Sequence, residues 1–366
     1  MPDATAAQPS AEPDIDSQAF SGLTPAEVLD ALDAVGLRGD GRILQLNSYE
    51  NRVFQVLLED GGAVVAKFYR PGRWSDAQIA EEHQFALELA AAEVPVVAPL
   101  TLQTSDPQVR LLPAHEPTHT SADRPTTLAI RQAAGGTQRY TAAPRCAGRA
   151  PELEDDAVLL RLGGFIGRLH AVGATAEFQH RRRFDPPADT RAALAQLLDG
   201  GFVHADQAAN WRSVCALAIL SIDEVFDRVQ PRALRLHGDC HPGNLLWRDA
   251  GAHVVDLDDC GSGPAVQDLW MLLSGEPVAA AHQLRQLLRG YDQFMAFDRR
   301  ELQLIDALRL TRMIRHNAWV AQRWADPAFP AAFPGFGSSA YWSQQSMQLR
   351  EQLAAAQEAP TFDTDD

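Results

Sequence analysis

The chain has 366 residues, of which 46% are hydrophobic and 22% are charged, enough for two lobes with separate cores. Its formal net charge of −16 disfavours a nucleic-acid partner, because phosphate contacts need a basic face. Residues 1–21 lack the basic and apolar regions of a signal peptide, and no apolar run is long enough to span a membrane.

The cysteines are Cys146, Cys215, Cys240 and Cys260, and they form neither a CxxC pair nor a regular framework. In a chain of this size that pattern favours reduced thiols. We therefore expect a cytoplasmic protein, and we expect it to be a monomer.

The first third of the chain alternates between strand and helix signals. Residues 23–37 have apolar positions at helical spacing after Thr24 and Pro25, an N-cap and a first helical residue. Residues 43–46, 53–58 and 63–69 read as antiparallel strands, with a hairpin turn at 60–62. A helix is predicted over 74–92 and another strand over 126–131.

The rest of the chain is mainly helical. Helices are predicted over 153–170, 191–198, 211–229, 284–294, 299–323 and 341–355, with short strands at 234–236, 244–247 and 253–257. Strands first and helices later indicate an α+β protein. We expect a disordered tail at 1–21, a nucleotide-binding N-lobe at 22–132, a helical C-lobe with the catalytic loop at 133–357, and an acidic disordered tail at 358–366. A hinge is expected at 133–136.

Three oxygen-bearing side chains stand out in the C-lobe. Asp239 and Asn244 lie five residues apart in a loop rich in Gly and Pro, and Asp256 ends an apolar strand. Phosphoryl transfer from ATP needs one carboxylate to accept the proton of the attacking hydroxyl, and an amide and another carboxylate to hold Mg²⁺. The pattern predicts Asp239 as base and Asn244 and Asp256 as metal ligands.

An upstream lysine fits the same chemistry. The run 64–68, Val-Val-Ala-Lys-Phe, places Lys67 in a strand, where kinases present a nucleotide-binding lysine pinned by a helix glutamate. On the following helix Glu82 shares the face of Ile79 and Phe85, whereas Glu81 is turned aside. Glu82 is the expected partner of Lys67.

These motifs resemble those of the aminoglycoside phosphotransferase and choline kinase superfamily, through His237-Gly-Asp-x-His-Pro-Gly-Asn244 and Asp256. More narrowly, the runs 46–53, 67–71, 81–87, 236–244 and 255–259 are similar to the bacterial stress response kinase A family. The resemblance implies a two-lobed protein-kinase-like fold with a small antiparallel-sheet N-lobe and a mostly helical C-lobe. It further implies a cytoplasmic serine/threonine protein kinase acting in stress responses, with ATP as co-substrate.

By position, the resemblance also implies that Ser48 contacts the nucleotide. The loop 47–51 contains no glycine, so we expect side-chain hydroxyl or amide groups, together with one or two backbone N–H groups, to contact the phosphates in place of a closely approaching glycine backbone. Residues 257–267 leave no room for a long activation loop before Asp268, which is expected to open an apolar helix at 269–273. We hypothesise that activation-loop phosphorylation does not switch this kinase on.

Three alternatives stay open. The first is a metal-dependent hydrolase that uses the histidines and carboxylates near Asp239. A helix would be needed to pair His237 with His241 as zinc ligands, and Gly238, Pro242 and Gly243 exclude a helix here. The favoured role of both histidines is to brace the loop through hydrogen bonds. A pseudokinase is weakened by the complete catalytic set. A small-molecule kinase with an aminoglycoside, choline or homoserine-like acceptor suits the negative charge as well as a basic peptide does.

A group of large side chains recurs on one face of the helix predicted over 299–323. Its members are Arg312, Arg315, Trp319 and Arg323. The spacing could frame a substrate groove, but it favours a packed tryptophan flanked by surface arginines.

Overall fold

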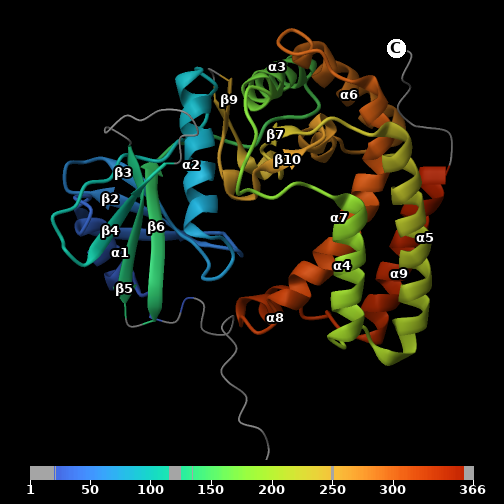
Figure 1. Ribbon diagram of the computed structural model, residues 1–366, viewed down its shortest axis with the longest axis horizontal. Coiled ribbons are helices and arrows are strands. Elements are labelled where there is room, and N and C mark those ends of the chain that lie inside the picture. Colours follow the sequence, from blue (N-terminus) through green and yellow to red (C-terminus); the bar gives the residue numbers. More distant parts are fainter. Residues whose placement is uncertain (1–19, 21, 115–124, 134, 249–250, 358–366) are drawn as a thin grey trace, which may run out of the picture.

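The structure is a computed structural model that describes residues 20, 22–114, 125–133, 135–248 and 251–357. A sheet lobe and a helical lobe lie side by side, and helix α2 (Asp76–Ala91) stands between them (Figure 1). The α+β class predicted from the sequence is confirmed. Within the described ranges, no helix combines the length and the apolar character that crossing a bilayer requires.

The sheet lobe contains six antiparallel strands in the order β1-β2-β3-β6-β5-β4. Their bounds are β1 Gly39–Leu46, β2 Arg52–Leu58, β3 Ala63–Phe68, β4 Val109–Pro113, β5 Thr126–Ala133 and β6 Gly136–Pro144. Helix α1 (Pro25–Asp33) covers the sheet and buries Val28, Ala31 and Leu32 against Phe54 and Val56. Burial alternates along β3, so Val64, Ala66 and Phe68 face this core while Lys67 points to the other side.

The first lobe extends further than the sequence predicts. Ala133 pairs with Gly136, so the expected hinge at 133–136 turns the chain back into the sheet, and β6 pairs with both β3 and β5. The expected boundary at 132 is therefore wrong, because Tyr140 and Ala142 of β6 supply part of the buried core of the first lobe. Strand β4 lies in a segment to which no element was assigned.

The two expected tails fall almost entirely outside the described residues. Phe20 is described, and its ring lies under the guanidinium group of Arg52, 4.5 Å from the ring centroid. This part of the expected disordered tail at 1–21 therefore packs against the sheet lobe. Nothing in the structure bears on 358–366.

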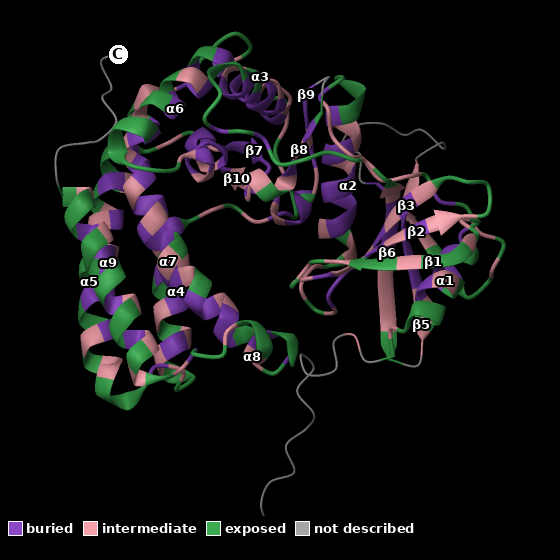
Figure 2. Ribbon diagram, turned by 180° about the vertical axis from the view of Figure 1, so that it is seen from behind, coloured by how far each residue is buried: buried purple, intermediate pink, exposed green. Residues whose placement is uncertain are grey.

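The helical lobe is built on close helix pairs. Its long helices are α3 Asp156–Gly173, α4 Pro186–Asp199, α5 Ala205–Val229, α6 Pro277–Tyr291, α7 Ile305–Gln322 and α9 Ser339–Gln357, with a short α8 Ala328–Ala332. Helices α3 and α6 touch through glycine, since a Cβ added at Gly163 would lie 1.8 Å from the Leu287 carbonyl oxygen. The buried faces of the helices, purple in Figure 2, turn toward one another. Helices α5 and α9 pack through the rings of Trp211 and Trp342, whose centroids are 5.0 Å apart.

Short strands and turns sit at the top of this lobe, beside α2. Strand β7 (Leu234–Leu236) pairs with β10 (Gly261–Gly263), and β8 (Leu245–Arg248) pairs with β9 (Gly251–Val254). The helix expected at 269–273 is absent; 3-10 turns η4 (Ala265–Asp268) and η5 (Trp270–Leu272) take its place. The carboxylate of Asp268 does not cap a helix, because it accepts hydrogen bonds from a neighbouring loop.

Candidate active site

The loop that follows β7 is fixed by a buried carboxylate. Both oxygens of Asp268, which is fully buried, accept backbone N–H groups: those of His237 and Gly238, each at 2.8 Å. The imidazole of His170 lies 3.1 Å from the same carboxylate. Gly238 has φ +88°, and a Cβ there would lie 2.3 Å from the Asp259 carbonyl oxygen, so only glycine fits.

His237 ties this loop to the strand that leads to Asp256. Its Nδ1 accepts the backbone N–H of Asp239 at 3.2 Å, so its Nε2 is the nitrogen that donates to the carbonyl oxygen of Val255 at 2.9 Å. His241 accepts the N–H of Gly243 through Nδ1 at 3.0 Å. Both histidines therefore make the loop-bracing contacts that the sequence favours.

Asp239 projects from this loop and is partly exposed. Its Oδ1 accepts a hydrogen bond from Nη1 of Arg312 at 2.9 Å, and its carbonyl oxygen accepts one from the side-chain amide of Asn244 at 3.0 Å. Burial by itself would raise the pKa of Asp239, but the guanidinium of Arg312, helped by His241, outweighs burial and keeps that pKa below its usual value. The carboxylate is ionised at neutral pH.

Asp256 follows β9 with a left-handed backbone, φ +61° and ψ +66°, and its side chain is half exposed. Its Oδ1 lies 3.6 Å from the Lys67 ammonium. Desolvation raises the pKa of Asp256, and the carboxylate of Asp258 adds to the rise. A bound cation would relieve both effects.

Lys67 and Glu82 form the pair expected from the sequence. The Lys67 Nζ lies 2.8 Å from Oε1 of Glu82 and 3.2 Å from Oδ1 of Asp258. Glu81 is turned away from Lys67, as expected, but it is buried too. Its carboxylate accepts the backbone N–H groups of Gln179, His180 and Arg181. Helix α2 therefore contacts the helical lobe through Glu81 and Lys67 of β3 through Glu82.

Asp258 is a residue that the sequence reasoning left without a role. Besides Lys67, it contacts Nη1 of Arg73 at 2.8 Å and the indole N–H of Trp74 at 3.4 Å. Burial would raise its pKa, but the three cations Lys67, Arg73 and Arg181 lower it far below the usual value. The carboxylates of Asp256 and Asp258 both approach Lys67. The position of Asp258 two residues after Asp256 is the signal that could have indicated a second inward carboxylate.

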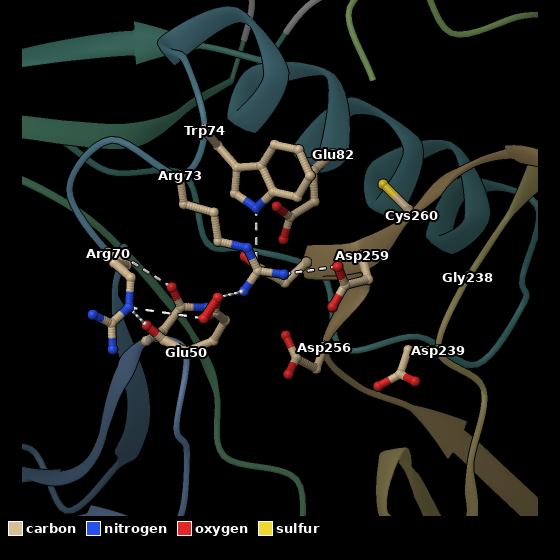
Figure 3. Close-up of polar contacts among 12 residues, drawn as sticks. Glu50, Arg70, Arg73, Trp74, Glu82, Gly238, Asp239, Asp256, Asp259 and Cys260 are labelled. Atoms are coloured by element: carbon tan, nitrogen blue, oxygen red, sulfur yellow. Dashed lines mark hydrogen bonds and ion pairs between the residues drawn. The ribbon is translucent and has the colours of Figure 1, made fainter. Parts of the chain in front are cut away.

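The loop expected to meet the nucleotide is joined to both lobes. Ser48 Oγ accepts the N–H of Asn51 at 3.3 Å, which leaves its hydroxyl hydrogen available to a ligand. Glu50 lies 3.3 Å from Arg73 and 3.1 Å from Nε of Arg323. Figure 3 draws Glu50, Arg70 and Arg73 as one polar group next to Asp256, Asp259 and Asp239.

The end of α7 holds the same loop from the other lobe. Arg70 donates to the carbonyl oxygen of Tyr49 at 3.0 Å and to Asp326 at 2.9 Å. The ring of Tyr49 packs on Trp319 with a centroid distance of 6.2 Å. The tryptophan is packed, as the sequence favours, but Arg312 and Arg323 are not merely surface residues because each pairs with a carboxylate of the site.

The side chains of this site are of the types that phosphoryl transfer uses. One carboxylate, Asp239, sits on a rigid loop, and the amide of Asn244 lies beside it with its nitrogen already engaged. An amide oxygen and a single carboxylate are a small ligand set of the kind Mg²⁺ uses when phosphates and water complete its shell. Among the described residues, no three His, Cys, Asp or Glu side chains form a group that could hold a metal ion by themselves.

A family model described as "Phosphotransferase enzyme family" matches residues 42–305. The chain belongs to this family. Stress response kinase A of Escherichia coli (strain K12) is 38% identical over 347 residues, covering 93% of this chain and 96% of the relative. Serine/threonine protein kinase RdoA of Salmonella typhimurium (strain LT2) is also 38% identical, over 341 residues, with the same coverage. The chain is therefore a kinase of the stress response kinase A type.

Solved structures agree with the fold. An amicoumacin kinase, hAmiN, in complex with AMP-PNP, Ca²⁺ and Ami aligns with a TM-score of 0.65 at 18% identity, over 93% of this chain and 96% of the other. A microcompartment-associated aminopropanol kinase aligns with a TM-score of 0.62 at 16% identity, over 91% and 96%. At such identities the likeness concerns the two-lobed kinase-like fold alone.

Proposed function

We propose that this enzyme transfers the γ-phosphate of ATP, with Mg²⁺, to a serine or threonine hydroxyl of a protein in the cytoplasm. The observation that supports the proposal is a chain of contacts: Asn244 donates to the carbonyl oxygen of Asp239, its own carbonyl oxygen accepts the N–H of Val255, and the next residue, Asp256, lies 3.6 Å from the Lys67 ammonium. The name of the relative from Salmonella typhimurium supports a protein acceptor. The free cysteines among the described residues agree with a reducing compartment. The monomeric state stays a prediction.

In the proposed mechanism Asp239 orients the acceptor hydroxyl and receives its proton. Asn244 and Asp256 would hold Mg²⁺, which when bound would neutralise charge on the phosphates. Lys67, fixed by Glu82, contacts the phosphates of the nucleotide, and Ser48 contacts the nucleotide from the loop between β1 and β2. The rigid Asp268 brace keeps the Asp239 loop in place, because this transfer depends on positioning and electrostatics.

The test of these roles uses two substitutions with different expected results. Asp239→Ala should lower kcat by at least about 100-fold, the usual contribution of a general base, while nucleotide binding stays near wild type. Asp256→Ala should also weaken Mg²⁺-dependent nucleotide binding. Asp206→Ala, an exposed carboxylate on α5, is the control. Retention of most activity by Asp239→Ala would show that the base lies elsewhere.

A small-molecule kinase is the second candidate, because the two structural neighbours are named for small acceptors. Labelled ATP and Mg²⁺ should be offered with generic protein acceptors beside amino alcohols and aminoglycosides. Label on protein supports our proposal, whereas label only on the small acceptors supports the alternative. Stoichiometric zinc in protein purified without added metal would instead favour a hydrolase.

A further inference from the structure

Two arginines on α7 lie one turn apart, and one of them contacts Asp239, the proposed base. Arg312 and Arg315 are three residues apart on the helix, and their side chains are 50% and 37% exposed. Nη1 of Arg312 lies 2.9 Å from Asp239 and 3.1 Å from the sulfur of Met271. The helix ends near α8, on the side of the helical lobe that is nearest to the sheet lobe (Figure 1).

The carboxylates near Arg315 are shared with other arginines. Nη1 of Arg315 lies 3.6 Å from Oδ2 of Asp189, but Arg182 already holds the same oxygen at 2.6 Å. The carboxylate of Asp259 is nearby but lies 2.7 Å from Arg73. The carboxylate of Asp189 is therefore shared by the guanidinium groups of Arg182 and Arg315. Desolvation, with Arg182 and Arg312 next to it, lowers the pKa of Arg315 in spite of Asp189 and Asp259.

The two neighbouring histidines add no positive charge at neutral pH. His316 follows Arg312 by four residues, and burial together with Arg312 lowers its pKa, so it is neutral at pH 7. Desolvation likewise lowers the pKa of His241 although Asp239 lies beside it. Asp239 is thus the carboxylate that balances Arg312.

The acceptor approaches the same carboxylate. An acceptor hydroxyl that gives its proton to Asp239 comes next to the guanidinium group of Arg312, which donates to Oδ1 of Asp239. Arg315 shares the carboxylate of Asp189 with Arg182 and is partly desolvated, so a negative group on the acceptor would be favoured beside it. Guanidinium groups suit carboxylates because they can donate two parallel hydrogen bonds.

We infer that Arg312 and Arg315 form an acceptor subsite that selects an acidic side chain close to the phosphorylated hydroxyl. The inference rests on the proposed protein-kinase function and adds its substrate class: serine or threonine in a segment that contains Asp or Glu. It runs against the net charge of −16, which suits a cationic acceptor. Salt screens the distant charges of the protein, so the charged groups next to Asp239 affect the bound acceptor more than the total charge does.

The experiment compares three peptides that share one serine and carry Glu, Gln or Lys at the flanking positions. With the full chain and Mg·ATP, we expect kcat/KM for the Glu peptide to exceed that for the Lys peptide by at least tenfold, and added salt to reduce the ratio. Arg312→Gln and Arg315→Gln should each lower this ratio at least threefold, and Arg315→Glu should lower it most. Arg309→Gln is the matched control on the same helix, because Arg309 pairs with Asp306 at 3.1 Å.

The ratio is insensitive to partial loss of folding, since misfolded enzyme lowers the rate for every peptide equally. Preference of the wild type for the Lys peptide, or a ratio unchanged in both glutamine variants, would overturn the acidic subsite while the protein-kinase function stands. Label transferred only to amino alcohols or aminoglycosides would overturn both. A general role of the arginines in positioning would lower all three peptides alike, and this result also contradicts the inference.

Discussion

At the scale of single residues, Asp268 connects the fold to the chemistry. It touches no predicted ligand, yet its two oxygens accept the N–H groups of His237 and Gly238, and His170 lies against it. His170 is in turn 2.9 Å from the hydroxyl of Tyr291, so the loop is connected to both α3 and α6. The position of Asp239 therefore depends on a fully buried carboxylate 29 residues away in the chain.

Replacing this carboxylate should affect both stability and rate. Asp268→Asn keeps the size but offers one acceptor oxygen and places an amide N–H₂ against a backbone N–H, so we expect a loss of about 3 kcal/mol in the free energy of unfolding. We also expect kcat to fall about tenfold or more as the Asp239 loop loosens. Denaturant unfolding and steady-state kinetics measure the two effects, with Asp206→Asn as control. Wild-type values for both would refute the bracing role.

At the scale of elements, α2 and the segment after Asp256 decide how the lobes meet. Two adjacent glutamates of α2 serve different partners, Glu82 for Lys67 and Glu81 for the backbone of 179–181. The segment from Asp256 to Asp268 is short and packed: Gly261 and Gly263 pair with β7, and the N–H of Ser262 donates to the carbonyl oxygen of Arg182. No part of it extends as a long loop.

This packing carries a prediction about regulation. Ser262 is the hydroxyl residue in 257–267, and its backbone is already ordered on both sides without a phosphate. We expect Ser262→Ala to keep kcat within about twofold of wild type, and intact-mass measurement to find active protein without phosphate in this span. Activity that depends strictly on a phosphate at Ser262 would contradict the absence of an activation-loop switch.

At the scale of the whole molecule, stability should depend on the protonation of a buried glutamate in the helical lobe. Glu301, 3% exposed, accepts the N–H of Val266 in η4 at 2.9 Å. Burial raises its pKa from 4.5 to about 7. A raised folded-state pKa means that its stabilisation is complete below pH 4.5 and is lost as the pH rises through 7.

Glu301→Gln should therefore gain stability relative to wild type as the pH rises. Between pH 4 and pH 8 the difference in the free energy of unfolding should shift in favour of the variant by about 3 kcal/mol, the equivalent of the pKa change. Urea unfolding at several pH values measures it, and Glu351→Gln, exposed on α9, is the control. A difference that stays constant with pH would show that Glu301 keeps its ordinary pKa when folded.

The α+β class and the phosphotransferase chemistry could be predicted from the sequence, because both depend on patterns of neighbouring residues. Alternation and helical spacing place the strands and most helices, and the residue types at 239, 244 and 256 suit only a few reactions. The pairing of Lys67 with Glu82 also followed from helical periodicity on one element. These inferences need no knowledge of which distant segments meet.

Contacts between distant segments were decided only by the tertiary structure. The sheet reaches Pro144 because Ala133 pairs with Gly136. Asp258 becomes the centre of a cation cluster because Lys67 of β3 and Arg73, in the segment before α2, approach it from the other lobe. Arg312 and Arg323 read as surface residues along their helix, since helical spacing records one face and not its partner. They form ion pairs with Asp239 and Glu50 only in the folded chain, which brings these distant segments together.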